Sequence, residues 1–245
     1  MPKLMDATME ELKTASNYKF SGVKVDELGA PEYSLVTIAQ DVSGSVTAFK
    51  TDMEECLKTI VEACQKSPRA ENLMLRLITF DDNLTEIHGF KLLNTVQGSN
   101  YNDSLTIGGC TSLFDAVESS IEATCQYAKI LKDQDFLTNA IVFVITDGMD
   151  NASKATINSV KKSIEDTVQK EVLESITTVL VGVGNNNGVS SYLSSFQRGA
   201  TIDQFVDIGD TTPKKLAKLA NFVSRSISST SQSLGTGSQS QLLTF

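Results

Sequence analysis

A short turn rich in acidic and hydroxyl groups, Asp41-Val42-Ser43-Gly44-Ser45, holds the side chains best suited to chemistry in this 245-residue chain. It follows an apolar run at 35–39 and precedes an amphipathic helical pattern, so we expect it at a strand-to-helix turn. A carboxylate and two hydroxyls at alternate positions can face one point, and hard oxygen ligands suit Mg²⁺. The turn therefore predicts a divalent metal site, although Asp, Ser and Gly also favour any tight turn.

Two further segments carry the same kind of residue. A glycine-rich loop leads through Thr111 into a predicted helix, and a buried strand at 141–145 is followed by Thr146-Asp147-Gly148. In doubly wound sheets the ligand crevice lies beyond the carboxyl ends of the strands, where the strand order reverses. We expect the two strands that end at Asp41 and Asp147 to be neighbours there, so that the three loops converge.

The order D-x-S-x-S, then Thr, then T-D-G resembles the metal-ion-dependent adhesion site of the von Willebrand factor A (VWA) family. The resemblance implies that Ser43 and Ser45 ligate the ion directly. It implies that Thr111 ligates directly or through water. Asp41 and Asp147 would hold ligands or waters from outside the first coordination sphere.

The resemblance covers roughly residues 33 to 228 and has one departure. Gln40 stands before the first Asp, where the family usually has an apolar residue. A buried amide needs hydrogen-bond partners, so we expect a different entry into the first loop, with no ligand missing. Among intracellular bacterial VWA proteins the chain is similar to the TerY-type stress proteins. That similarity implies partners among kinases, phosphatases or ATPases, but these residues select none of them.

Strands and helices alternate along the chain, which predicts an α/β fold. We expect a doubly wound, mainly parallel central sheet with one antiparallel edge strand at 84–93 and helices on both faces, as in VWA and Rossmann-like folds. The other expected strands are 34–40, 73–80, 140–145, 176–183 and 205–208. The expected helices are 46–64, one from 113, 151–170, 188–197 and one from 213.

The chain divides by composition into three predicted parts: an N-terminal extension at 1–32, a VWA domain at 33–228 and a C-terminal tail at 229–245. Within the extension, 8–14 is expected to be a short helix and 18–25 a strand that extends the sheet or binds a partner. The Ser, Gln and Gly of the tail predict disorder in a free segment. Its apolar end, Leu242-Leu243-Thr244-Phe245, also suits docking on a neighbour, in a homo-oligomer or larger assembly, and both interpretations stay open.

The net charge of -9 argues against nucleic-acid and anionic-membrane binding, because neutralising phosphates takes clustered Lys and Arg. The N-terminal residues 1–6 lack an apolar leader pattern, and no run reaches membrane-spanning length. The four cysteines show no C-x-x-C spacing, so we expect reduced thiols, with Cys110 partly exposed beside the metal loop. These features predict a cytoplasmic protein.

The predicted function is a metal-dependent protein–protein interaction module. Mg²⁺, with Mn²⁺ or Ca²⁺ as alternatives, would keep an exchangeable position that an Asp or Glu of a partner fills. With His88 as its single histidine, the chain cannot build a Ser-His-Asp or two-His site, so we expect no catalytic residues and no organic cofactor. The loop 182–188 has the wrong spacing for a dinucleotide fingerprint and is expected to be a turn.

Two other functions remain as alternatives. One is a structural assembly subunit that uses its terminal extensions and has little need of the metal. The other is a Mg²⁺-dependent phosphoryl-transfer enzyme with Asp41 as nucleophile. That chemistry normally needs a second Asp two residues on, where this chain has Ser43.

Overall fold

The computed structural model describes residues 8–184, 186–238 and 240–245. In these residues the strands are β1 (Met9–Lys13), β2 (Lys19–Val23), β3 (Glu32–Asp41), β4 (Leu73–Phe80), β5 (Leu84–Leu92), β6 (Leu137–Thr146), β7 (Ile176–Gly182) and β8 (Gln204–Asp207). The α-helices are α1 (Lys50–Gln65), α2 (Leu113–Lys132), α3 (Ile157–Gln169), α4 (Asn187–Ala200) and α5 (Pro213–Thr236). Short 3₁₀ helices are η1 (Val25–Glu27), η2 (Gly44–Phe49), η3 (Ala70–Asn72), η4 (Leu93–Thr95) and η5 (Gly98–Tyr101).

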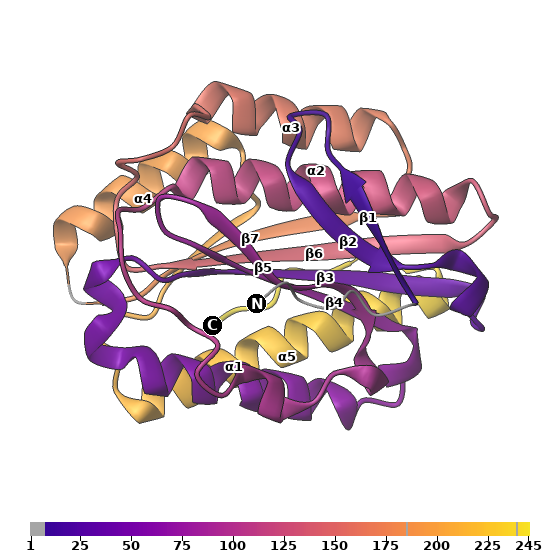
Figure 1. Ribbon diagram of the computed structural model, residues 1–245, viewed down its shortest axis with the longest axis horizontal. Helices are drawn as coiled ribbons and strands as arrows, with labels where there is room; N and C mark the ends of the chain where they lie inside the picture. The colour runs from indigo at the N-terminus through magenta and orange to yellow at the C-terminus, as the bar shows by residue number, and fades with distance from the viewer. Residues whose placement is uncertain (1–7, 185, 239) are drawn as a thin grey trace.

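The strands form one sheet in the order β1-β2-β5-β4-β3-β6-β7-β8 (Figure 1). From β4 to β8 through the centre, neighbouring strands are parallel, and β5 is antiparallel to β4. The chain moves outward from β3 to β4 in one direction and crosses to β6 in the other, so the strand order reverses between β3 and β6. The predicted α/β doubly wound, mainly parallel sheet is confirmed.

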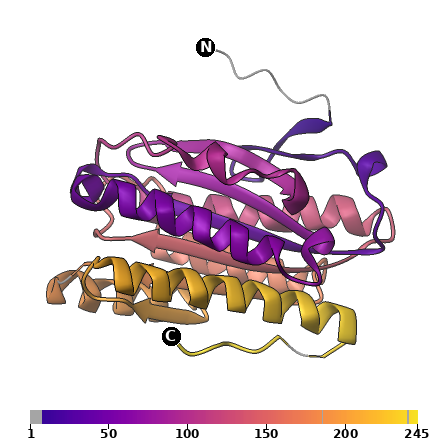
Figure 2. The same ribbon diagram turned by 90° about the horizontal axis from the view of Figure 1, so that it is seen from below.

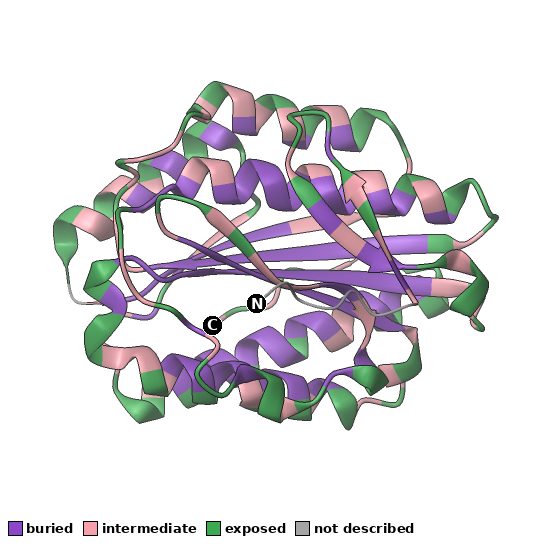
Figure 3. Ribbon diagram, viewed as in Figure 1, coloured by how far each residue is buried: buried purple, intermediate pink, exposed green. Residues whose placement is uncertain are grey.

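Helices cover both faces of the sheet. Figure 1 shows α2, α3 and α4 on one face and α1 and α5 on the other. Alternate residues of β6 serve the two faces: Ile141 and Phe143 pack with the α1 and α5 residues, whereas Val142 and Val144 pack with α2, α3 and α4. A strand that is covered on both sides needs a largely apolar sequence, and β4 and all of β6 after Leu137 are buried (Figure 3).

Two helices begin later than the sequence pattern indicates. The helix expected from Val46 starts as the 3₁₀ segment η2 and becomes α-helical at Lys50. The helix expected from residue 151 starts at Ile157, because Thr156 is its N-cap and its hydroxyl accepts from the Ser159 backbone N–H. Instead of forming a first helical turn, Asn151 bonds the loop at Thr111 and Ser153 bonds the start of α2 at Asp115.

The N-terminal residues extend the sheet as a hairpin. The helix predicted at 8–14 is wrong: β1 pairs residue for residue with β2, and non-local pairing overrides the helix propensity of Glu and Leu. The strand predicted at 18–25 is confirmed as β2, which pairs in parallel with β5 at Gly22 and Phe90. The antiparallel strand predicted at 84–93 is confirmed as β5, but it is not at the edge of the sheet, because β2 and β1 lie beyond it and β1 is the antiparallel edge strand. The predicted absence of a leader at 1–6 lies outside the described residues.

The serine-rich segment after Arg225 continues α5 as far as Thr236. The small side chains of Ser226, Thr230 and Ser233 are buried against the sheet, so packing stabilises this part of the helix despite its polar composition. The predicted division between 228 and 229 falls inside this helix.

The last residues return along α5, as Figure 2 shows. Leu243 and Phe245 pack against the apolar core on the α1 and α5 face. The ring of Phe245 lies 5.8 Å from that of Phe222, edge to face, and Lys218 Nζ lies 4.2 Å from its centroid. The C-terminal segment is thus seated on its own domain.

The remaining sequence expectations concern single residues and composition. Cys56, Cys64 and Cys125 are free and buried, and Cys110 is free and exposed. His88 lies on β5, with Nε2 2.9 Å from the Tyr101 hydroxyl. Across the described residues, no helix combines the length and apolar character needed to cross a bilayer. The expected turn at 182–188 includes Asn185, which lies outside the described residues.

Candidate metal centre

The three predicted loops meet at the carboxyl ends of β3 and β6. These strands are parallel neighbours whose register pairs Gln40 with Ile145, so the residues that follow each strand leave the sheet at the same edge. The start of α2 brings the loop around Thr111 to this edge. Backbone bonds join the loops, because Gly44 N–H donates to Gly109 O at 3.3 Å and Gly108 N–H donates to Val42 O at 2.9 Å.

Asp41 is completely buried and both of its carboxylate oxygens accept hydrogen bonds. Oδ1 accepts from the Ser43 backbone N–H at 2.8 Å, and Oδ2 accepts from the Thr146 hydroxyl at 2.5 Å. Burial raises the pKa of Asp41 to about 6, although these hydrogen bonds lower it. Asp41 therefore ties the first loop to the end of β6. Thr146 belongs to the T-D-G motif, but the sequence alone predicts no role for it.

Ser43, Ser45 and Asp147 form a connected row of oxygens. The Ser43 and Ser45 hydroxyl oxygens are 3.1 Å apart, and the Ser45 hydroxyl donates to Asp147 Oδ1 at 2.8 Å. Adjacent ligands of an octahedral Mg²⁺ ion, at metal–oxygen distances of 2.0–2.1 Å, are about 2.9 Å apart. The two serine hydroxyls already have nearly that spacing. Burial raises the pKa of Asp147, while its bond from Ser45 lowers it.

Thr111 approaches the same point across a glycine. A Cβ atom added to Gly148 would lie 3.2 Å from Thr111 Oγ1 and 3.9 Å from Asp41 Oδ2. The missing side chain thus leaves room for the threonine hydroxyl to approach the Asp41 carboxylate. Asn151 fixes the threonine backbone, since its Oδ1 accepts from Thr111 N–H at 2.8 Å and its own N–H donates to Thr111 O at 3.0 Å. Sequence reasoning missed Asn151, whose only signal was an amide four residues after Asp147.

The second loop has its own conformational requirement. Gly109 has a φ of +70°, and a Cβ there would lie 2.3 Å from Asp82 Oδ2, so a larger residue would meet both strain and a clash. Asp82 Oδ1 accepts from the Cys110 backbone N–H at 3.2 Å. A separate hydrogen bond of the Cys110 thiol itself to the Asp82 carboxylate raises the pKa of this thiol.

Gln40 is buried, with 1% of its surface exposed, as the departure from the family pattern implied. Its Nε2 donates to Asp41 O at 2.8 Å, so this amide holds the chain at the entry to the first loop. Among the described residues its Oε1 has no hydrogen-bond partner.

The donor set of the candidate centre fits a hard cation. In the part of the chain that the structure describes, no three or more His, Cys, Asp or Glu side chains gather to hold a metal ion. The centre has two carboxylates, and its other side-chain oxygens are the hydroxyls of Ser43, Ser45 and Thr111. Hydroxyl and carboxylate oxygens suit Mg²⁺, Mn²⁺ or Ca²⁺ rather than a soft-ligand metal site. The predicted residues therefore lie together, and their roles as ligands stay a prediction.

Comparison with known proteins identifies similar folds at low sequence identity. No protein-family model matches the chain, and no curated protein matches it. The PilB minor pilin from Streptococcus sanguinis is 14% identical with a TM-score of 0.61, and the match covers 91% of this chain and 67% of the pilin. Its D319A mutant gives 12% identity, a TM-score of 0.62, and coverage of 89% and 66%.

Two other similar structures come from different organisms. The pilus adhesin SpaC from Lactobacillus rhamnosus GG is 11% identical with a TM-score of 0.58, covering 94% of this chain and 36% of SpaC. The proximal thread matrix protein 1 of the mussel byssus is 18% identical with a TM-score of 0.55, covering 82% and 46%. This chain thus spans between about a third and two thirds of these proteins. At such identities the similarity shows the fold alone: an α/β, Rossmann-like fold consistent with the VWA type.

Proposed function

We propose that this chain is a VWA-type interaction module that binds a partner protein through a divalent metal ion. Ser43, Ser45 and Thr111 would hold the ion, and Mg²⁺ is the first choice, with Mn²⁺ or Ca²⁺ as alternatives. The observation that supports this proposal is the connected group of oxygens that the ends of β3 and β6 bring to one edge of the sheet, with Thr111 of the second loop beside Gly148.

The charges of the centre explain why we expect it to bind a carboxylate of a partner protein. A bound divalent ion would supply an electrophilic position for an incoming carboxylate. Asp147 accepts from the Ser45 hydroxyl and so orients that oxygen, while Asp41 holds the Ser43 backbone and the Thr146 hydroxyl. The three hydroxyl ligands are neutral, so an Asp or Glu of the partner would not be repelled by the coordinating residues themselves.

The geometry favours binding over phosphoryl transfer. A nucleophilic Asp41 would need a free carboxylate oxygen, but the side chain is completely buried and both oxygens accept hydrogen bonds. The proteins with similar folds are described as a pilin, a pilus adhesin and a matrix protein, which agrees with a non-enzymatic role. A phosphatase assay with Mg²⁺ tests this point: turnover that is lost in Asp41→Asn would overturn the proposal.

The cellular setting rests on the sequence alone. The TerY-like type, the link to stress response and the cytoplasmic location stay predictions. The alternative of a structural assembly subunit loses support, since the C-terminal segment is seated on its own domain instead of being held out for a neighbour.

The partner is tested by affinity capture from the native host. Wild-type protein with Mg²⁺ should retain a partner that is released by EDTA and is absent with Asp41→Ala. Ser190→Ala is the matched control, because it removes another serine hydroxyl that donates to an aspartate, Asp207, on a different strand. Equal capture by wild type, Asp41→Ala and EDTA-treated protein would contradict a metal-dependent interaction.

A further inference from the structure

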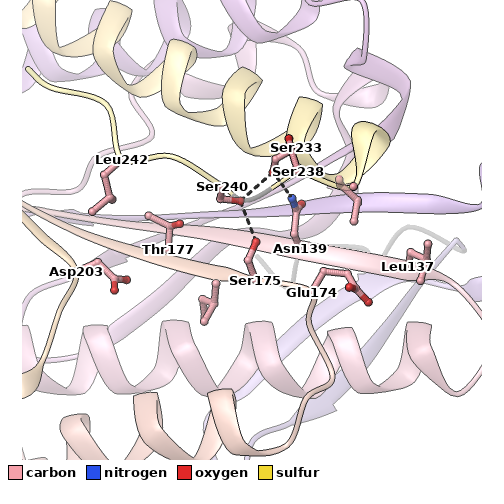
Figure 4. Close-up of a pocket in the computed structure, with 13 residues that line it drawn as sticks. Leu137, Asn139, Glu174, Ser175, Thr177, Asp203, Ser233, Ser238, Ser240 and Leu242 are labelled. Atoms are coloured by element: carbon pink, nitrogen blue, oxygen red, sulfur yellow. Dashed lines mark hydrogen bonds between the residues drawn. The ribbon is translucent and has the colours of Figure 1, made fainter.

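A second concave site lies at the other end of the sheet from the metal centre. Its volume is about 560 Å³, within the usual range for small-molecule sites. It is enclosed by the first residues of β6 and β7, the end of α5 and the C-terminal segment (Figure 4). The metal centre lies at the carboxyl ends of β3 and β6, so the two sites are separated by the length of the parallel strands.

The short edge strand β8 explains why a cavity forms here. β8 pairs with β7 only from Val179 onward, so the first residues of β7 have no described strand beside them on that side. The C-terminal segment lines this region through Ser240 and Leu242. It is held by Ser240, whose hydroxyl oxygen lies 2.9 Å from those of Ser175 and Ser233.

The cavity has acceptor groups but no cationic side chain. Glu174 and Asp203 are its two charged lining residues, and no Lys, Arg or His is found among the described lining residues. Figure 4 shows Ser175 and Thr177 between these two carboxylates, so the acidic groups lie toward opposite ends. Leu137, Leu234 and Leu242 provide apolar contact surface.

A buried acceptor in the wall has no partner. Asn139 is 1% exposed, and its Nδ2 donates to Thr230 O at 2.6 Å. Its Oδ1 has no hydrogen-bond partner within the described residues. An unpaired buried carbonyl is costly, so a ligand that donates a hydrogen bond here would be stabilised. Asn139 Oδ1 and the two carboxylates are all acceptors, so they favour a ligand rich in N–H donors.

The geometry points to a binding site for a linear diamine or polyamine. One terminal ammonium group faces Asp203 and the other faces Glu174, while the methylene chain lies along the leucine side chains. In a polyamine, an internal N–H donor also serves Asn139 Oδ1 and the serine hydroxyls. Anionic ligands are disfavoured by the two carboxylates, and a neutral sugar would leave both charges without a counter-charge.

The two carboxylates differ in their structural roles, and this difference decides how each can be substituted in a test. Asp203 also has a structural role, because its Oδ2 accepts from Thr178 N–H and from the Thr178 hydroxyl, both at 2.7 Å. Asp203→Asn keeps an oxygen for these bonds and removes the charge. Glu174 is exposed, so Glu174→Gln removes charge without a burial cost. Glu165→Gln with Asp166→Asn on α3 is the matched control, since it changes the net charge equally outside the cavity.

Calorimetric titration of the full chain with spermidine, at physiological salt and without divalent metal, tests the site. We expect saturable one-to-one binding that is at least tenfold weaker in Glu174→Gln/Asp203→Asn and changes less than twofold in the control. A loss in Glu174→Gln alone supports the same conclusion without touching Thr178. Butylamine, with one charged end, should bind at least tenfold more weakly than a diamine of suitable length.

Several results would overturn this inference. They are the absence of saturation, an equal loss of spermidine affinity in Glu174→Gln/Asp203→Asn and in the α3 control, or equal binding of butylamine and the diamine. An equal loss would mean that amines collect around a chain of net charge -9 without a site. Because no divalent metal is present, none of these results bears on the metal-dependent function proposed above.

Discussion

Asp41 is the residue on which the candidate metal centre would depend most, because it is both completely buried and ionisable. Burial raises its pKa to about 6 in the metal-free protein. The charged carboxylate is the form that accepts from Ser43 N–H and the Thr146 hydroxyl. Protonation of Asp41 and metal binding therefore oppose each other, because the centre needs the ionised carboxylate.

This competition predicts a pH dependence with a definite sign. Without metal, the folded state holds its proton more tightly than the unfolded chain, so this group contributes less stability as pH rises from about 4 to about 6. With Mg²⁺ present the ionised form is favoured, so the stabilisation by metal should be full above pH 7 and decline as pH falls through 6. Melting curves at pH 5 and pH 7.5, with and without Mg²⁺, measure this. A metal-induced shift of equal size at both values would be inconsistent with it.

Gly148 makes a second prediction for single residues. In Gly148→Ala the new methyl group would lie 3.2 Å from Thr111 Oγ1, so it should push this hydroxyl out of place. We expect Mg²⁺ affinity to fall about tenfold, with a stability change under about 1 kcal/mol because the contact is tight but not a severe clash. Gly29→Ala is the control, since a Cβ there meets nothing within 4 Å. Unchanged affinity in Gly148→Ala would remove Thr111 from the ligand set.

The sequence indicates which five side chains come to one edge of the sheet, because carboxylates and hydroxyls at strand ends have a simple pattern, and their roles as ligands stay a prediction. It does not indicate their supporting partners. Asn151 reaches the second loop through tertiary contacts with Thr111, which no spacing in the sequence indicates. Thr146 is visible in the motif, but its bond to Asp41 depends on how β3 and β6 pair.

At the scale of the elements, the segment between β6 and α3 acts as a support for the centre. The Asp115 carboxylate, in the first turn of α2, accepts from the backbone N–H groups of Lys154 and Ala155, the latter at 2.7 Å. Asp150 Oδ1 accepts from the Phe114 backbone N–H at 3.2 Å. The start of α2 and the segment 150–155 are therefore joined in both directions, because an aspartate of each accepts from backbone N–H groups of the other.

This link predicts the effect of Asp115→Ala. The substitution leaves two backbone donors without their acceptor, which should cost about 1–2 kcal/mol and lower the melting temperature by about 3–6 °C. Asp133→Ala, at the other end of α2, removes an exposed pair with Lys129 and should have a smaller effect. Equal shifts in the two variants would mean that Asp115 has no special role in joining the loops.

The elements also show which parts of the fold follow from local sequence. Strands such as β4 and β6 are predictable because apolar runs covered on both sides have few alternatives. The strand β1 is not, because its conformation depends on pairing with β2. The end of α5 is stabilised by the burial of Ser226, Thr230 and Ser233, a packing effect that composition alone does not reveal.

At the scale of the whole molecule, parallel strands separate two distinct chemical environments. The candidate metal centre lies beyond their carboxyl ends, where the strand order reverses between β3 and β6. The acidic cavity lies beside the opposite ends of β6 and β7. The C-terminal segment covers part of the α5 face through Leu243 and Phe245, so it belongs to the folded domain.

The most direct measurement of the central claim is a Mg²⁺ titration of thermal stability in three proteins: wild type, Asp41→Ala/Ser43→Ala and the control Ser190→Ala. A ligand that binds only the native state stabilises it by about 2.7 kcal/mol at a concentration 100 times its Kd. For a chain of this size that corresponds to an increase of about 5–10 °C. Wild type and Ser190→Ala should show this increase and the double variant should show none. The same increase in all three proteins would contradict a metal centre at these loops.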